Sequence, residues 1–304
     1  MAAPLFLLAP PRSYTSLVNA MIGQHPQAFG LPELCMFVVD KLKEMWMPPT
    51  DPRIESQPTW AIHGFLRAVA EIYAGEQSAA AITMAHHWAI AREERSIASV
   101  YQELVAKIDP LISVEKSPIY TTSLKCMLSI REAFPDARFL HLVRHPISQC
   151  KSVMSLNEGT FAKYVNSIEF TDNRAIIEPQ IAWHDLNINI LNFLDTVPKE
   201  QQLRMRGEDI IENPRHYLPI ICRWLGIRDD DEAIEEMIHT ERSPFACFGP
   251  FNALFGNDPA FLKGPTFRPH KVKIPSLDMP VPWRKDKKGL RPEVVAMAQE
   301  FGYK

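Results

Sequence analysis

Strand-like runs alternate with amphipathic segments along most of this sequence. Strands are expected at residues 5–9, 28–30, 112–118, 137–143 and 201–205. The first and fourth of these runs are almost entirely apolar, which is typical of strands that a parallel sheet buries on both faces. The sequence therefore predicts an α/β fold, in which a central parallel sheet is flanked by helices.

Apolar positions at helical spacing predict the connecting elements. Helices are expected at residues 15–23, 60–73, 79–108, 121–134, 179–194, 229–240 and 290–303, with others starting just after Leu34 and at Asn213-Pro214. Residues 79–108 read as one helix whose charged run, 92–95, faces solvent. Together with residues 60–73 it interrupts the strand series, which predicts a helical cap at about residues 45–110 within a single domain of residues 1–304.

Three further segments complete the predicted layout. The proline-rich residues 47–58 are expected to form an exposed loop. Residues 157–172 show no clean period and are expected to form an irregular, mobile loop. Trp183 lies on the apolar stripe of its helix and is expected in the core.

Composition narrows the class of protein. The chain has 304 residues, of which 46% are hydrophobic and 23% are charged, which is ordinary for a globular domain. The net charge of −3 gives no sign of a nucleic-acid partner. The five cysteines form no C-x-x-C pair, which indicates neither a zinc site nor a disulfide framework. No stretch approaches the roughly 18 apolar residues of a membrane span, and we expect a cytoplasmic protein.

The stretch PLFLLAPPRSYTSL, residues 4–17, predicts a strand, a tight turn and a helix N-terminus. Free backbone N–H groups and the positive end of the helix dipole favour an anion at such a turn. Ser13, Thr15 and Ser16 add hydroxyl donors, and Arg12 adds a guanidinium. The alternative interpretation is a strand that ends in Ser/Thr caps with a solvated arginine.

Two later strands also end in cations. Residues 137–143 run into Arg144-His145-Pro146, and Ser152 follows two helical turns further on. Arg144 and Ser152 are therefore placed to reach one phosphate. The strand at residues 112–118 ends in Lys116-Ser117-Pro118. Because parallel strands bring their carboxyl ends to one edge, we expect Arg12, Lys116 and Arg144 on the same side of the sheet.

In this order, the motifs resemble the sulfotransferase family that uses 3'-phosphoadenosine 5'-phosphosulfate (PAPS), whose fold is similar to that of P-loop NTPases. The family's PRSGTT-like loop corresponds to residues 11–16, and its R-D-P…S element corresponds to residues 144–152. Its R-Y-E-D-L…P…F-L-G element resembles residues 206–226. The Lys-x-Pro strand end is similar to that of the protein-tyrosine and bacterial small-molecule branches. Three residues depart from the pattern: Tyr14 replaces a glycine, His145 an aspartate and Gly207 a tyrosine.

The resemblance implies roles for particular residues. Arg12, Ser13, Tyr14, Thr15 and Ser16 would bind the 5'-phosphosulfate. Arg144 and Ser152 would bind the 3'-phosphate. Arg12 and Lys116 would also stabilise the leaving phosphate. Glu33 follows the second strand in a P-E-L context and would be the catalytic base. Alternatively, Glu33 is a carboxylate at a helix N-terminus, where it interacts favourably with the helix dipole. His86 or His87 is a second candidate for the base.

The family also closes the 3'-phosphate site with a late basic loop. The basic C-terminal segment, at about residues 245–291, offers Lys263, Arg268 and Lys271 for this role, or else is a solvated tail. The chemistry implied is in-line transfer of a sulfuryl group from PAPS to a hydroxyl acceptor, which leaves 3'-phosphoadenosine 5'-phosphate (PAP). No metal is expected to take part.

Phe and Leu side chains of residues 245–267 suggest a partly apolar, small-molecule acceptor. A P-loop kinase would need G-x-x-x-x-G-K-[ST], which the first loop lacks. The other alternative is a nucleotide-binding protein of this fold without turnover. Membrane and nucleic-acid partners are not expected.

Overall fold

The computed structural model describes residues 2–46, 61–156, 159–171 and 174–304. Five parallel strands form the central sheet in the order β2-β3-β1-β4-β7. The strands are β1 (Leu5–Leu8), β2 (Ala28–Gly30), β3 (Ile112–Glu115), β4 (Arg138–Val143) and β7 (Gln202–Arg206). Two more strands, β5 (Ile168–Thr171) and β6 (Arg174–Ile177), pair antiparallel outside this sheet. The α/β fold with a central parallel sheet is thereby confirmed.

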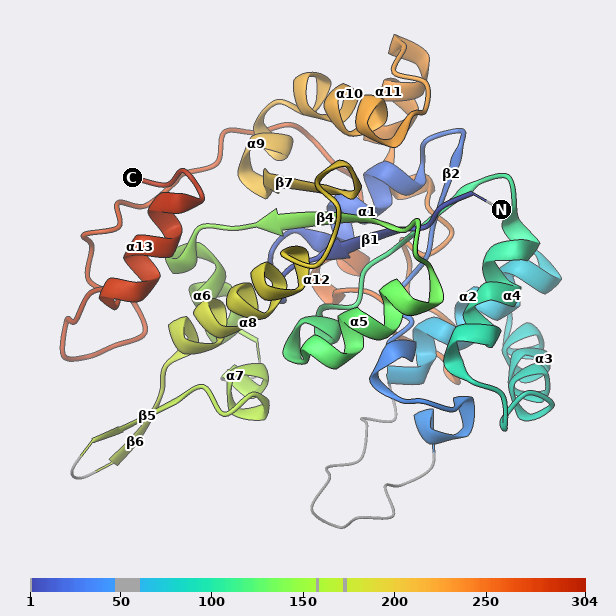
Figure 1. Cartoon of the computed structure of the whole chain (residues 1–304), viewed down its shortest axis with the longest axis horizontal. Helices are drawn as coiled ribbons and strands as arrows, with labels where there is room; N and C mark the ends of the chain where they lie inside the picture. The colour runs from blue at the N-terminus through green and yellow to red at the C-terminus, as the bar shows by residue number, and fades with distance from the viewer. Residues whose placement is uncertain (1, 47–60, 157–158, 172–173) are drawn as a thin grey trace.

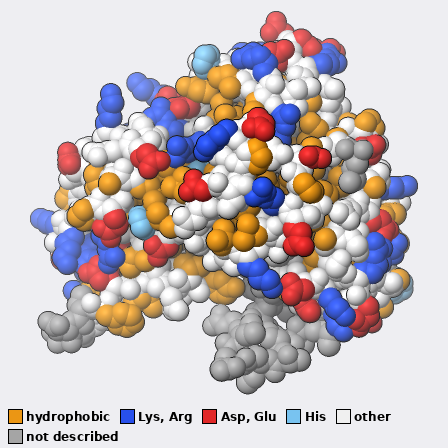
Figure 2. Space-filling model, in the orientation of Figure 1, with side chains coloured by type: hydrophobic (Ala, Val, Ile, Leu, Met, Phe, Trp, Pro, Cys, Tyr) orange, Lys and Arg blue, Asp and Glu red, His pale blue; other side chains and the backbone are white. Residues whose placement is uncertain are grey.

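Helices cover both faces of the sheet (Figure 1). They are α1 (Thr15–Gly23), α2 (Ile62–Ala74), α3 (Ala79–Ile90), α4 (Ile97–Ile108), α5 (Leu124–Ala133), α6 (Pro146–Met154), α7 (Thr160–Tyr164), α8 (Pro179–Leu194), α9 (Gly207–Glu212), α10 (Pro214–Leu225), α11 (Asp231–Ile238), α12 (Pro259–Lys263) and α13 (Pro292–Glu300). Figure 2 shows acidic and basic side chains interspersed on one face of the molecule, in keeping with a net charge near zero.

Alternation along β1 builds the two layers of the core. Phe6 and Leu8 face one layer, which contains α2 to α5 and part of α8. Leu5 and Leu7 face the other layer, which contains α1, α9, α10 and α11. Successive side chains of a strand point to opposite faces, so a strand with helices on both sides must be apolar throughout. Trp183 is 1% exposed and packs against α13, which confirms its place in the core.

Three expectations about connecting segments are wrong. Residues 79–108 are two helices, because Ser96 caps α4 by accepting a hydrogen bond from the Ser99 backbone N–H. The intervening Arg92 and Arg95 turn back to pair with Glu103 instead of lining a solvated helix face. Residues 159–171 and 174–177 form α7 and the β5–β6 hairpin rather than an irregular loop. Backbone pairing between the two strands and a hydrogen bond from the Ser167 hydroxyl to the Glu178 carbonyl hold the hairpin.

The third wrong expectation is a helix after Leu34. The chain there has only a short 3-10 turn at Met36–Val38, because side chains from the end of β3 hold its backbone N–H groups. The predicted loop at residues 47–58 lies outside the described residues. Within the described part of the chain, no helix is long and apolar enough to cross a membrane.

Candidate active site

The carboxyl ends of β1, β3, β4 and β7 are adjacent in the sheet, and the candidate site is built on the turns that follow them. The turn from β1 to α1 contains no glycine. Arg12 (φ 68°) and Tyr14 (φ 64°) take the left-handed conformation instead, at a cost of roughly 1–2 kcal/mol each. Tyr14 is the N-cap of α1, and its side chain does not cap the helix. The first N–H groups of α1 therefore have no acceptor within the helix.

Lys116 links this turn to the end of β2. Its side chain is 1% exposed, and its Nζ donates to Ser16 Oγ at 2.7 Å and forms an ion pair with Glu33 Oε1. The Glu33 side chain is 22% exposed. A buried ammonium requires a partner of opposite charge, so the ion pair fixes the position of the carboxylate. The structure thus brings together Glu33, Lys116 and Ser16, three of the predicted site residues.

Arg144 extends from the end of β4 over the same turn. One of its terminal nitrogens donates to the Arg12 carbonyl at 2.5 Å, and its guanidinium lies 4.1 Å from the centroid of the Tyr14 ring. Its Nε is buried without a hydrogen-bond partner among the described residues. Burial is the main cause that lowers the pKa of this guanidinium, against the opposing influence of Tyr14 and Glu208.

The Arg12 side chain pairs with two segments that lie far from it in the sequence. Its Nε donates to Ser152 Oγ at 3.0 Å, and its terminal nitrogen forms an ion pair with Asp258. Ser152 is therefore bonded to Arg12, whereas the structure shows no hydrogen bond from Arg144 to Ser152 within its described residues. The Asp258 backbone N–H also lies 3.3 Å from Ser16 Oγ.

Asp258 was missed by the sequence analysis. The only sequence signal is the Asp258-Pro259 pair, which is typical of a helix start. Its carboxylate indeed accepts from the Ala260 N–H at 2.8 Å and caps α12. That cap gives no indication that the same carboxylate lies beside Arg12, 246 residues earlier in the chain.

Orphaned donors at the turn show that it fits an anion. Ser13 is fully buried, and neither its Oγ nor the Nε of Arg144 has a partner in the described structure. Buried polar atoms are rarely left unpaired. With the free N–H groups at the start of α1, they form a donor set suited to the oxygens of a phosphate or phosphosulfate. Thr15 and Ser16 are also buried there.

The segment that carries Glu33 is held by a row of polar groups from β3 and its continuation. The Leu34 N–H donates to Glu115 Oε1 at 3.2 Å, the Cys35 N–H to Ser117 Oγ at 3.0 Å, and the Met36 N–H to the Tyr120 hydroxyl at 2.9 Å. Glu115 is fully buried, which raises the pKa of its carboxyl to about 8. These contacts also could not be predicted from the sequence, because no sequence pattern links residues 34–36 to residues 115–120.

Two glycines pack against the Glu33 backbone. A Cβ built on Gly64 would lie 1.9 Å from the Glu33 carbonyl oxygen. The Glu33 N–H donates to the Gly256 carbonyl at 2.7 Å, and Gly256 has a φ of 128°. Glu33 is therefore enclosed between α2 and the late segment that leads to Asp258.

The other base candidates are on α3. His86 and His87 are exposed on α3. His63, beside Gly64, stacks on Phe255, with ring centroids 6.0 Å apart. His63 was not among the site residues predicted from the sequence.

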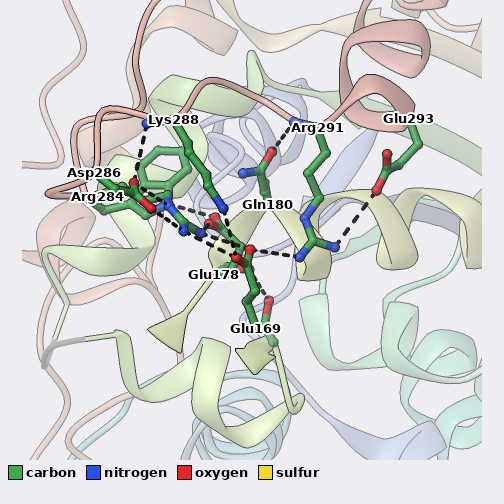
Figure 3. Close-up of polar contacts among 10 residues, drawn as sticks. Glu169, Glu178, Gln180, Arg284, Asp286, Lys288, Arg291 and Glu293 are labelled. Carbon is green, nitrogen blue, oxygen red and sulfur yellow. Dashed lines mark hydrogen bonds and ion pairs between the residues drawn. The ribbon is translucent and has the colours of Figure 1, made fainter. Parts of the chain in front are cut away.

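The late basic segment divides into two parts. Lys263, Arg268 and Lys271 are exposed, and none of their side chains has a polar partner among the described residues. Phe267, next to Arg268, is buried in the core layer against which Tyr14 also packs. Farther along, Arg284 and Arg291 bind Glu169 of β5, and Arg284 also binds Glu178, next to α8 (Figure 3).

Residues of the R-Y-E-D-L-like element support the end of β4. Glu208 accepts from the His145 N–H at 3.0 Å and from the Tyr303 hydroxyl at 2.8 Å. Burial lowers the pKa of the His145 imidazole to about 4, so this ring is neutral at neutral pH. His145 therefore supplies no cationic charge at the place where the family has an aspartate.

The comparisons with known proteins agree with this architecture. The model of the family described as "Sulfotransferase family" matches residues 4–231, and the chain belongs to this family. A sulfotransferase domain from the curacin biosynthetic pathway matches with a TM-score of 0.73 and 22% identity, over 100% of this chain and 99% of that one. A sulfotransferase domain from the Synechococcus PCC 7002 olefin synthase matches with a TM-score of 0.70 and 23% identity, over 100% and 97%.

At these identities the two structures show a shared fold, which is the P-loop-like fold of sulfotransferases. The comparison with curated proteins finds no match.

Proposed function

We propose that this chain transfers a sulfuryl group from PAPS to the hydroxyl of a small molecule and releases PAP. The observation that carries the proposal is the buried Lys116, which bonds Ser16 of the anion-binding turn and Glu33 at once. A protein that only bound a nucleotide would have no need of a carboxylate fixed beside the phosphate site. The family to which the chain belongs supports the same reaction.

In the proposed reaction the acceptor oxygen attacks sulfur in line with the bond from sulfur to the 5'-phosphate oxygen. That bond breaks, and its electron pair stays on the phosphate of PAP. The N–H groups of the turn, Ser13 and Lys116 face the growing negative charge, and fixed donors of this kind are worth roughly 2.7–4 kcal/mol each. The sulfuryl group passes through a loose transition state, so positioning and charge stabilisation carry most of the catalysis.

Glu33 would take the proton of the acceptor hydroxyl. Lys116 binds its Oε1, which leaves Oε2 to accept the proton. A positioned base of this kind contributes typically about 10²–10⁴-fold. Because one ammonium contacts both the base and the donor site, the two reacting groups are held at a fixed separation.

Arg144 and Ser152 would bind the 3'-phosphate, and Arg12, which donates to Ser152, would bind the 5'-phosphosulfate. Lys263 and Arg268 are placed on the late segment, where they would add long-range attraction for a polyanion. No metal ion is assigned a role in this reaction.

An apolar rim supports a partly apolar acceptor. Phe251 is 88% exposed, and Phe248 and Leu254 are exposed beside it. This loop leads directly into Gly256, whose carbonyl binds the Glu33 backbone. An acceptor that places its hydroxyl at Glu33 would therefore lay an apolar portion along these side chains.

Calorimetric titration with PAP tests the donor assignment. We expect binding to wild type, at least about 10-fold weaker binding to Arg144→Ala, and no binding of ATP. Arg138→Ala, at the opposite end of β4, is the matched control and should bind PAP like wild type. Absence of PAP binding, or tighter binding of ATP, would overturn the proposal.

A transfer assay then tests catalysis. Labelled PAPS is offered with a panel of apolar molecules that carry one hydroxyl. Glu33→Gln should lower kcat by about 10²–10⁴-fold and leave PAP affinity nearly intact. A protein that binds PAP but transfers nothing to any acceptor would instead be a nucleotide-binding member of the fold.

A further inference from the structure

The Tyr14 side chain lies between two segments that are distant in sequence. On one side is the Arg144 guanidinium, 4.1 Å from the ring centroid. On the other side is Gly207, where a built Cβ would lie 2.6 Å from Tyr14 Cδ2 and 3.4 Å from Cγ. Any side chain at residue 207 would collide with the Tyr14 ring. The position of the ring therefore depends on the glycine at residue 207.

Tyr14 holds this position in an unfavourable backbone conformation. Its φ of 64° is rare for a bulky residue, and it occurs in the loop that faces the anion site. Such outliers persist where the surroundings over-determine them and are concentrated at functional sites. The side chain of Tyr14, a Cβ that carries an aromatic ring and its hydroxyl, occupies a position where such a turn would favour glycine.

Arg144 lacks the partner that normally orients a guanidinium. The nearby carboxylate of Glu208 is already bonded to the His145 N–H and the Tyr303 hydroxyl. Among the described residues, one terminal nitrogen of the Arg144 guanidinium donates to the Arg12 carbonyl, and its Nε has no hydrogen-bond partner. An aromatic face orients the guanidinium without neutralising it, whereas a carboxylate would compete with an incoming phosphate.

We infer that Tyr14 is a positioning residue for donor binding: its ring, given room by Gly207, holds Arg144 in place for the 3'-phosphate of the nucleotide. The inference rests on the proposed function. It also explains the two departures from the family pattern together, because an aromatic ring at residue 14 and a glycine at residue 207 require each other.

Calorimetry with PAP and with adenosine 5'-monophosphate, which lacks the 3'-phosphate, tests this role. Tyr14→Phe keeps the ring and should bind PAP within about threefold of wild type. Tyr14→Leu removes it and should weaken PAP binding about 5- to 30-fold, which is the range expected for a partly desolvated cation–π contact. Its affinity for adenosine 5'-monophosphate should change much less.

Gly207→Ala displaces the ring without altering the turn and should weaken PAP binding in the same selective way, which covers the case in which Tyr14→Leu does not fold. Trp224→Leu is the matched control, since it removes a cation–π contact to Arg138 at the far end of β4. It should leave PAP affinity unchanged.

The outcomes separate the two proposals. If wild type binds PAP and both Tyr14→Leu and Gly207→Ala bind it equally well, the role of Tyr14 is refuted and the proposed function stands. A parallel loss of affinity for both nucleotides would also refute it, because the effect would then be general damage to the turn. If wild type does not bind PAP, the proposed function and this inference both fall.

Discussion

The Tyr14 ring fills the space that a side chain at Gly207 would occupy, with 2.6 Å between Tyr14 Cδ2 and a Cβ built on Gly207. The two residues belong to the turn after β1 and to the start of α9 after β7. Each is unusual by itself: a tyrosine with positive φ and a glycine at the first position of a helix. Together they form one packing unit at the edge of the sheet.

Exchanging the two residues tests this packing unit. Gly207→Tyr alone should destabilise the protein by about 1–3 kcal/mol, because two rings compete for one space. In the double variant Tyr14→Gly/Gly207→Tyr, at least half of that loss should be recovered, since glycine relieves the left-handed turn and vacates the space. Urea unfolding of wild type, Tyr14→Gly, Gly207→Tyr and the double variant gives the coupling free energy. Strictly additive losses would show that the two sites do not share this space.

Gly64→Ala is expected to impair catalysis more than donor binding. The added methyl group would lie 1.9 Å from the Glu33 carbonyl oxygen, so Glu33 must shift. Displacement of a catalytic group by about 1 Å can cost about 10²-fold in rate. We expect kcat to fall by at least about 10-fold, with PAP affinity within about threefold of wild type. Gly264→Ala is the control, because its added methyl meets nothing within 4 Å; equal kcat losses in both variants would contradict the role of Gly64.

Glu115 predicts a specific dependence of stability on pH. Burial raises the pKa of this carboxyl to about 8 in the folded protein, against about 4.3 when unfolded. Between these values the folded state keeps a proton that the unfolded state has lost. The contribution of Glu115 to stability is therefore fully present below about pH 4 and declines as pH rises towards 8.

Glu115→Gln keeps an acceptor for the Leu34 N–H and cannot ionise. Relative to wild type, the variant should gain about 1 kcal/mol or more in free energy of unfolding between pH 5 and pH 9. Urea unfolding at several pH values measures this difference. His141 and His145 titrate alike in both proteins, so their effects cancel. A difference between variant and wild type that does not change with pH would show that Glu115 is ionised in the folded protein.

The ion-pair network between the β5–β6 hairpin, Glu178 and the C-terminal segment should be important for stability. The side chains of Arg284 and Glu178 are 2% and 0% exposed, and Trp283 donates to the other Glu178 oxygen at 2.7 Å. Arg284→Met would leave Glu178 buried without its cation and should cost about 3–5 kcal/mol. The exposed pair of Arg223 and Asp229 is the matched control, and Arg223→Met should cost less than about 1 kcal/mol. Similar costs in the two variants would mean that the buried network contributes no more than a surface pair.

The sequence by itself determined the parallel sheet and the location of the turn that we propose binds an anion. Both depend on local signals: apolar runs such as residues 5–9 and 137–143 predict buried strands, and parallel strands place their following residues at one edge. That is why Lys116 and Glu33 could be expected at the same edge of the sheet, although 83 residues separate them.

Tertiary structure alone decided which partner each site residue has. Arg12 binds Asp258, and three N–H groups after Glu33 bind side chains from the end of β3, which removes the helix that local pattern predicted. Tyr14 and Gly207 likewise look like two separate departures in the sequence. They become one feature only when β1 and β7 bring them into van der Waals contact, because sequence periodicity encodes which face a residue occupies but not which distant residue fills the space beside it.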